Sequence, residues 1–403
     1  AGLIWIGPRP ETIALTGDKL TARRIAREAG LPVLSGPEVP VGEEQEADLD
    51  DLIEAQTDFP VMVKAISGGG GRGIRLAHNR EELKQMIRQA SRESKSSFGD
   101  DGIYLEPFVN QARHIEVQII GDGADNVLIL GERECSIQRR RQKLIEEAPA
   151  PNLSDEQRQL VQEYAHQLGL ALNYRSLGTV EFLLDCDGNF YFIEVNPRIQ
   201  VEHPVSELVL GIDLVRMQLR LALNGDMKYT QDQIVVRGAA IEARILAEDP
   251  ASGFLPAAGK VSYVQEPDGP GIRVDSALFQ GMEVTTDYDS LIAKVIVWGE
   301  DREAAIGRLT RALKEFQVSG VPTSKELLSK IISQENFVHG NVDTTFLDNF
   351  DPRLAERTEA LEKIAAIAAA LAMHREKKSK KQDAAQENNW RKTAWLEQMR
   401  GTI

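Results

Sequence analysis

Apolar and β-branched residues recur in short runs, which predict β-strands, and elsewhere fall at helical spacing. The runs predict strands over residues 1–6, 59–66, 103–109, 114–120, 177–186, 190–193, 237–246 and 291–298. The helical spacing predicts helices over residues 16–29, 49–56, 80–94, 154–168, 214–224 and 302–316. Asn79 and Ser154 are expected N-caps, the latter with Gln157 three residues on. Short strands near 259–264 and 272–274, together with 291–298, are expected to form a second sheet.

The most informative pattern is FYFIEVNPRIQVEH at residues 190–203, where a buried strand runs into polar residues at even-numbered positions. Alternate side chains of an extended segment share a face, so Glu194, Asn196, Arg198 and Glu202 are expected to project into one space. Carboxylate and amide oxygens suit Mg²⁺, and a guanidinium suits a planar oxyanion. Solvated charges at a strand end are the alternative, and they explain four such groups less well.

A hairpin is expected to bring a second carboxylate to this strand. Residues 177–186 precede the turn Asp187-Gly188-Asn189, and pairing across that turn places Glu181 beside Glu194. Two carboxylates repel each other unless a cation lies between them, which favours a Mg²⁺ site.

A glycine-rich loop follows the strand that carries Lys64. The stretch SGGGGRGIR at residues 67–75 exposes backbone N–H groups with no Cβ in the way, so it can fold over phosphate oxygens. A flexible hairpin tip is the alternative. With Lys64 upstream and Arg72 inside it, we interpret the loop as a mobile flap over nucleotide phosphates.

A basic run and three further positions complete the candidate chemistry. Arg139, Arg140, Arg141 and Lys143 lie beside Gln138, and in an acidic chain they favour a local pocket for small anions. Glu106 and the backbone of residues 107–109 are a candidate adenine edge. A single histidine such as His114 at the start of a strand is more often a structural, hydrogen-bonded residue than a ligand. Arg244 is either a surface cation or a second oxyanion ligand.

Composition narrows the class of protein. The 403 residues are enough for two or three domains, and 42% hydrophobic with 27% charged residues is typical of a globular chain. A formal charge of −15 argues against non-specific nucleic-acid binding, and no apolar run is long enough to span a bilayer. Cys135 and Cys186 match no zinc or disulfide framework, which fits a reducing compartment: the cytoplasm, or the mitochondrial matrix in a eukaryote.

The two ends of the chain suggest neighbouring modules. The sequence opens on AGLIWIG without an initiator Met, and we expect residues before it. Residues 354–385 predict a long Ala-rich helix, followed by a polar spacer and an amphipathic piece at 390–399, which we interpret as a linker into another module.

Four motifs together resemble the biotin carboxylase component of biotin-dependent carboxylases, in the ATP-grasp superfamily: Lys64 with SGGGGRG, ERECSIQRRRQKLIEEAPAP, EFLLDCDGNFYFIEVNPRIQVEHP and IEARILAEDP. The resemblance covers roughly residues 1–350 and implies an α+β ATP-grasp fold. It implies the end of an N-terminal Rossmann-like domain with a connecting helix at 1–36, a glycine-loop lid at 37–108, a larger C-terminal domain at 109–350 and a helical linker at 351–403.

The resemblance also implies roles for single residues. ATP contacts would be Lys19, Lys64, Gly70, Gly71, Glu106, Pro107, Phe108, Val109, His114, Gln138 and Arg141. Metal ligands would be Glu181, Glu194 and Asn196, and bicarbonate would meet Lys143, Arg198, Gln200, the N–H of Val201, and Glu202. Arg244 would face biotin. Two departures are visible: Arg141 stands where some relatives have His, and Pro107, often a Lys, leaves only a backbone contact.

The implied activity is carboxylation of biotin with ATP, Mg²⁺ (or Mn²⁺) and bicarbonate, through carboxyphosphate. The tail is similar to that of acyl-CoA carboxylase α-subunits, so the implied partners are a carboxyltransferase subunit, a biotin carboxyl carrier domain and further copies of the chain in a homo-oligomer. A pyruvate carboxylase domain, or another ATP-grasp ligase such as a carbamoyl-phosphate synthetase, is the alternative. A non-catalytic module would be expected to lack one of Lys64, Glu194, Arg198 or Glu202, and all four are present.

Overall fold

The computed structural model of the chain describes residues 2–34, 36–39, 46–66, 73–348 and 350, and seven positions between 363 and 393. The chain divides into two compact units, Ala1–Asp351 and Pro352–Ile403. The seven described positions of the second unit are helical, and the rest of the predicted linker lies outside the described residues.

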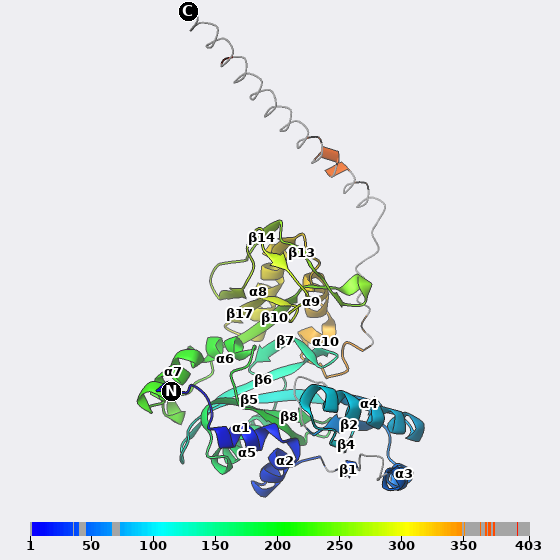
Figure 1. Ribbon diagram of the computed structural model, residues 1–403. Coiled ribbons are helices and arrows are strands. Elements are labelled where there is room, and N and C mark those ends of the chain that lie inside the picture. The colour runs from blue at the N-terminus through cyan, green and yellow to red at the C-terminus, as the bar shows by residue number, and fades with distance from the viewer. Residues whose placement is uncertain are drawn as a thin grey trace, which may run out of the picture. The chain divides into compact units, whose positions relative to one another are not determined.

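An eight-stranded antiparallel sheet forms the centre of the first unit, in the order β15-β17-β10-β7-β6-β5-β8-β9 (Figure 1). Its strands are β5 (Arg113–Asp122), β6 (Val127–Arg139), β7 (Gln142–Ala148), β8 (Arg175–Leu184), β9 (Phe190–Asn196), β10 (Ala239–Leu246), β15 (Ile272–Ser276) and β17 (Leu291–Gly299). The predicted second sheet is wrong, because β10 pairs with β7 on one side and β17 on the other. Alternation predicts strands but not the partners with which they pair.

Helices cover both faces of this sheet (Figure 1). One face packs against α2 (Lys19–Glu28) and α5 (Asp155–Ala171) near β5, β8 and β9, and against α8 (Arg302–Glu315) and α9 (Lys325–Ile332) near β10 and β17. The opposite face packs against α6 (His203–Leu210) and α7 (Leu214–Asn224). The short α10 (Glu335–Val338) follows α9.

Period-two alternation along β5 separates a hydrophobic face from a polar one. Ile115, Val117 and Ile119 belong to the core under α5. His114 and Glu116 alternate with them and therefore project from the other face, although they are also buried. The hydrophobic core on one side thus holds a row of polar groups in place on the other.

A separate four-stranded antiparallel sheet, in the order β1-β4-β2-β3, uses residues between 38 and 107. Its strands are β1 (Glu38–Val39), β2 (Val61–Ala65), β3 (Ile74–Ala77) and β4 (Ile103–Pro107), and it packs against α3 (Glu46–Ala55) and α4 (Arg80–Phe98). Most of the predicted glycine loop, with Gly70 and Gly71, lies outside the described residues. Short two-stranded ladders complete the unit: β11 (Glu248–Asp249) with β12 (Leu255–Pro256), β13 (Gly259–Lys260) with β16 (Glu283–Val284), and β14 (Tyr263–Gln265) with β18 (Gln317–Ser319).

Helix starts follow the predicted caps. Asn79 accepts the Glu82 N–H at 2.9 Å, and Ser154 forms a capping box with Gln157. The helix predicted over 16–29 is confirmed as α2, but its predicted start is wrong: α1 (Pro10–Gly17) contains residues 16 and 17, and Asp18, which has an extended backbone, separates the two helices and caps α2. The strand predicted over 1–6 is also wrong, since described residues 2–6 pair with no strand.

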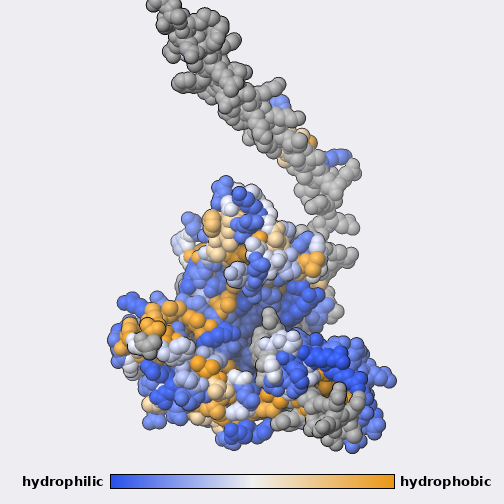
Figure 2. Space-filling model, viewed as in Figure 1, coloured by the Kyte–Doolittle hydropathy of each residue, from blue (hydrophilic) through white to orange (hydrophobic). Residues whose placement is uncertain are grey.

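Exposed apolar side chains gather around α7 on the face drawn in Figure 2. Val215, Leu219 and Leu223 follow one another at a spacing of four residues along this helix and are 41%, 40% and 63% exposed. Across the described part of the chain, no helix combines the length and the hydropathy that membrane crossing needs.

Candidate active site

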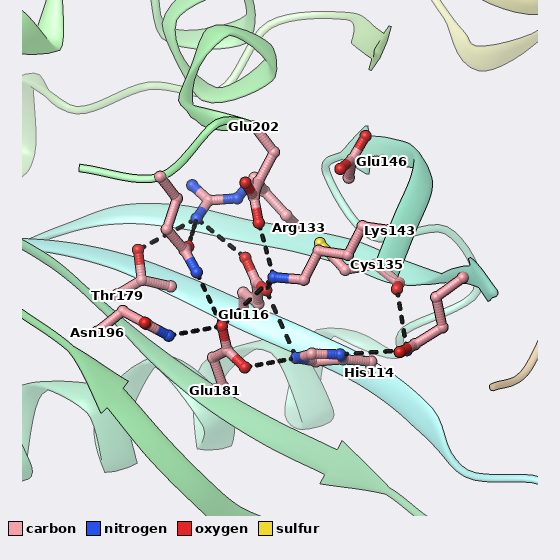
Figure 3. A network of polar contacts seen from close by, with 12 residues as sticks. His114, Glu116, Arg133, Cys135, Lys143, Glu146, Thr179, Glu181, Asn196 and Glu202 are labelled. Carbon is pink, nitrogen blue, oxygen red and sulfur yellow. Dashed lines mark hydrogen bonds and ion pairs between the residues drawn. The ribbon is translucent and has the colours of Figure 1, made fainter. Parts of the chain in front are cut away.

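A cluster of buried charged residues lies on the polar face of the large sheet (Figure 3). Strand pairing assembles it, because Glu116 on β5 is directly opposite Glu181 on β8 and Arg133 on β6. Directly opposed side chains in a sheet are close neighbours. Two carboxylates and a guanidinium therefore meet although they are far apart in the sequence.

Lys143, at the start of β7, is the central cation of this cluster. Its Nζ forms an ion pair with Glu116 and lies 2.6 Å from Glu202 Oε1 and 3.3 Å from Glu181 Oε1. Burial opposes the ammonium, but the three carboxylates outweigh it and raise the pKa of Lys143 well above its ordinary value. Lys143 is therefore charged and holds three acidic side chains together.

Arg133 is a fully buried guanidinium beneath the cluster. It donates to oxygens on four separate segments, at 2.8 to 3.2 Å: Glu116, Gln118, Thr179, Gln200 and Ser206. Neither Arg133 nor Glu116 was predicted from the sequence. Arg133 lies inside one of the four motifs, but no role was assigned to it, and Glu116 lies in a strand with no such motif.

Arg244 on β10 joins two further carboxylates. Its Nε donates to Glu146 Oε1 at 2.6 Å, and its Nη2 donates to Glu202 Oε2 at 3.0 Å. The buried pairs identify Arg244 as a member of the cluster and exclude the surface alternative. Burial tends to raise the pKa of Glu202, but Lys143 and Arg244 hold it below its ordinary value, so Glu202 is ionised.

The predicted metal ligands lie together at the β8–β9 edge. Glu181 and Glu194 are paired in register, as the hairpin predicted, and Asn196 Nδ2 donates to both carboxylates at 2.8 and 3.2 Å. Burial and the charge of Glu181 raise the pKa of Glu194, which has no ion-pair partner among the described residues. Two carboxylates with this charge imbalance and an amide oxygen are hard ligands that fit a divalent cation.

His114 stands beside these ligands. Its Nε2 lies 3.0 Å from Glu181 Oε2, and its Nδ1 lies 3.4 Å from Gln138 Nε2. Burial disfavours the imidazolium, yet Glu181 raises the pKa of His114 above its ordinary value. His114, Glu116 and Glu181 offer ligand atoms within 4.8 Å of one another, but the ammonium of Lys143 already occupies the cation position between the two carboxylates.

A second group of predicted residues lies where α2 meets the small sheet. Lys19 Nζ donates to the Ala65 carbonyl at 2.9 Å, and burial lowers its pKa. Lys64 forms an ion pair with Glu106, whose other oxygen lies 3.1 Å from Arg23 Nη1. Of the candidate hinge residues, Pro107 is exposed, while Phe108 and Val109 are half-buried.

The turn after β9 departs from the predicted alternation. The strand ends at Asn196, so only Glu194 and Asn196 follow the period-two pattern, and the expected extended segment through Glu202 is wrong. The four residues nevertheless meet in one region, because Asn196 contacts Glu194 and Arg198, and Lys143 joins Glu202 to Glu181. Arg198 is exposed and donates to Asn196 Oδ1 at 3.2 Å, while Glu202 is the residue before α6. Gln200 is buried between Arg133 and Glu181, at 2.9 and 2.8 Å.

The basic run does not form one anion pocket. It is the turn of the β6–β7 hairpin, where Arg140 and Arg141 have positive φ angles of 49° and 64°. Arg139 stacks over the Phe254 ring at 3.6 Å, and Arg141 donates to the Ile74 carbonyl at 2.8 Å. Among the basic residues of the run, Lys143 is the one that the structure brings into the buried cluster.

Comparisons with known families cover most of the chain. The family described as "Carbamoyl-phosphate synthase L chain, ATP binding domain" matches residues 18–230, and "Biotin carboxylase C-terminal domain" matches residues 242–349. Together they span the residues of the cluster.

Curated relatives carry the same resemblance. A biotin carboxylase of Nostoc sp. is 46% identical over 351 residues, 87% of this chain and 77% of that protein. A pyruvate carboxylase subunit of Methanothermobacter thermautotrophicus is 40% identical, over 92% of this chain and 78% of that protein. The mitochondrial propionyl-CoA carboxylase alpha chain of Sus scrofa is 43% identical, over 87% of this chain and 48% of that protein.

A solved structure agrees with the fold. The biotin carboxylase domain of Hydrogenobacter thermophilus 2-oxoglutarate carboxylase, a dimer in complex with MgADP, ADP and bicarbonate, superposes with a TM-score of 0.83 and 41% identity, covering 88% of this chain and 78% of that one. With both family matches in chain order, and relatives at 40% to 46% identity across more than four fifths of its length, the chain belongs to the biotin carboxylase family of ATP-grasp ligases.

Proposed function

We propose that this chain carboxylates biotin on a carrier domain, using ATP and bicarbonate, as the first half-reaction of an acyl-CoA carboxylase. The observation that carries the chemistry is the ionised Glu202 held between Lys143 and Arg244. This arrangement offers a proton acceptor and two cations in one buried place, next to ligands that suit a divalent metal ion.

Glu202 acts as the general base on bicarbonate. Its low pKa keeps the carboxylate ready to accept the proton while a bicarbonate oxygen attacks the γ-phosphorus of ATP, which gives carboxyphosphate and ADP. Lys143 and Arg198 hold the anion in line, together with Gln200 and the N–H of Val201. Arg198 is exposed, so its side chain is free to turn toward the substrate from its bond with Asn196.

The nucleotide is held by residues on both sheets. Lys19, Lys64, Glu106, His114, Gln138 and Arg141 contact ATP, with the backbone of residues 107–109 at the adenine. Gly70 and Gly71, which lie outside the described residues, are further candidate phosphate contacts. Glu181, Glu194 and Asn196 would hold Mg²⁺ or Mn²⁺, which would offset phosphate charge. Because Lys64 is paired with Glu106, it must exchange partners when phosphate binds.

Biotin carboxylation completes the reaction. Carboxyphosphate breaks down into CO₂ and phosphate, the phosphate takes the N1′ proton of biotin, and the nitrogen then attacks CO₂. Arg244 stabilises the negative charge that develops on the ureido oxygen. Because Arg244 already bonds to Glu146 and Glu202, it enters the reaction in an orientation that these carboxylates maintain.

The test is ADP formation by the purified chain, measured with and without bicarbonate and free biotin. Stimulation by both, lost in Glu202→Gln and retained in the exposed control Lys314→Met, supports the proposal. ATP turnover that is indifferent to biotin but requires another nucleophile such as ammonia would overturn it and favour another ATP-grasp ligase.

The acyl-CoA class rests on two observations: the similarity to the propionyl-CoA carboxylase alpha chain and the Ala-rich stretch after residue 353. Pyruvate carboxylase is the second candidate, because the pyruvate carboxylase relative matches 92% of the chain. Transfer of labelled carboxyl groups by the carboxyltransferase that purifies with this protein distinguishes them. Labelled acetyl-CoA or propionyl-CoA derivatives support the first class, and labelled oxaloacetate formed from pyruvate contradicts it.

A further inference from the structure

Two side chains outside the reacting cluster hold the backbone of the turn before α6. His203 Nδ1 lies 2.7 Å from the Gln200 carbonyl oxygen, and Lys294 Nζ donates to the Val201 carbonyl oxygen at 2.8 Å. Successive peptide carbonyls of this turn are therefore each bound by a separate basic side chain, and the Gln200 carbonyl also accepts the more distant backbone N–H of His203 at 3.3 Å. Neither side chain is among the residues assigned to substrate above.

Because a peptide group is planar, a bond that fixes a carbonyl also fixes the direction of the next N–H. In a trans peptide the N–H of one residue points opposite to the carbonyl of the residue before it. The bond from His203 to the Gln200 carbonyl therefore sets the direction of the Val201 N–H, and the bond from Lys294 sets the direction of the Glu202 N–H. Burial lowers the pKa of His203, so the donor is a neutral ring with its proton on Nδ1.

The place of Lys294 in the sheet explains its reach. It lies directly opposite Arg244 in the pairing of β10 with β17, and opposite Asp275 on β15. Its Nζ is 3.2 Å from Asp275 Oδ2 and 3.9 Å from Glu242 Oε2, and the residue is 9% exposed. Neighbouring strands thus present two cations to consecutive residues: Arg244 to the Glu202 side chain and Lys294 to the Val201 backbone.

The burial of Lys294 indicates that its ammonium has a specific role. An ammonium removed from water is costly unless its hydrogen bonds are satisfied, and a hydrophobic residue would fill the same space at lower cost. Asp275 neutralises Lys294 from one side, while the Val201 carbonyl takes the remaining well-formed bond. The arrangement is thus suited to hold a turn in one conformation rather than only to fill the core.

We propose that His203 and Lys294 are positioning residues for the bicarbonate site: His203 aims the Val201 N–H at the anion, and Lys294 fixes the next peptide, which carries Glu202. The inference rests on the proposed function, in which the Val201 N–H contacts bicarbonate. Loss of the His203 side chain loosens the Gln200–Val201 peptide and weakens the hydrogen bond from the Val201 N–H to the anion. Loss of Lys294 loosens the Val201–Glu202 peptide and weakens the contact of Glu202 with the anion. The ATP contacts, which lie on other elements, stay in place.

The test is steady-state kinetics of biotin-dependent ADP formation in Lys294→Met, with Lys294→Arg as the conservative variant and Lys314→Met on the exposed side of α8 as the matched control. Lys294→Met is expected to raise the KM for bicarbonate about tenfold, as for one weakened hydrogen bond between Glu202 and the anion, and to change the KM for ATP by less than about twofold. Lys294→Arg keeps a donor and is expected to recover most of the loss.

His203 supplies an independent second arm if Lys294→Met folds poorly. His203→Asn keeps a donor near the position of Nδ1 and is expected to retain a low KM for bicarbonate, whereas His203→Leu is expected to lose it. Equal increases in both KM values, or no difference between His203→Asn and His203→Leu, would overturn the positioning role. Absence of bicarbonate dependence in the unaltered protein would instead overturn the proposed function.

Discussion

Arg133→Met is the most demanding test of the buried cluster. The guanidinium is fully buried, pairs with Glu116 at 3.1 Å and donates to four other side chains. Removing one partner of a buried ion pair costs about 3–5 kcal/mol, because the other charge stays buried. Glu116 retains Lys143 as a partner, so we expect a loss of about 3 kcal/mol, at the lower end of that range.

Urea unfolding followed by circular dichroism measures this loss as a lower midpoint at an unchanged slope. Arg220→Met is the matched control, because Arg220 also binds one carboxylate through two nitrogens, at 3.0 and 2.5 Å to Asp226, but at the surface. Its expected cost is below about 1 kcal/mol. If Arg133→Met destabilises the protein no more than Arg220→Met, the cluster contributes little to stability.

A double-mutant cycle separates charge from packing. In Arg133→Met combined with Glu116→Gln, the buried carboxylate is gone as well, so the two losses are expected to be less than additive by about 1–3 kcal/mol. Strictly additive losses would mean that the ion pair itself contributes nothing and that the cost of Arg133→Met lies in its other hydrogen bonds.

Three further predictions test separate parts of the structure. Mg²⁺ should raise the melting temperature of the unaltered protein more than that of Glu194→Gln, because a divalent cation offsets the burial and the repulsion from Glu181 that raise the pKa of Glu194. Equal shifts in a thermal titration would contradict the metal site. Burial raises the pKa of Glu242 well above its ordinary value, so the folded state binds more protons than the unfolded state. The free energy of unfolding should therefore fall as pH rises above about 4.3, the pKa of the unfolded chain. In urea unfolding, Glu242→Gln should be more stable than the unaltered protein at pH 8 and equal to it at pH 4. Gly178→Ala should lower the free energy of unfolding by about 1–3 kcal/mol, because the added Cβ would lie 2.0 Å from Tyr174 Oη. A loss equal to that of Ser154→Ala, about 1 kcal/mol, would show that the tyrosine moves aside easily.

Local interactions explain the features that the sequence predicts correctly. The capping box of Ser154 with Gln157 spans three residues, and the pairing of Glu181 with Glu194 follows from a hairpin whose turn is visible in the sequence. In both cases the partners are close along the chain, so composition and spacing are sufficient. Where a strand ends was not predictable in the same way, because Arg198 continues the polar alternation after the backbone has left the strand.

The sequence by itself determined the family, the hairpin that carries Glu181 and Glu194, and the residue types available for anion and metal binding. Tertiary structure alone decided that Glu116 and Arg133 belong to the cluster, and that Lys294 reaches the Val201 carbonyl across 93 residues of chain. These contacts depend on which strands become neighbours in the large sheet. Strand pairing between distant segments is selected by the packing of the whole core, and no local pattern of residues records it.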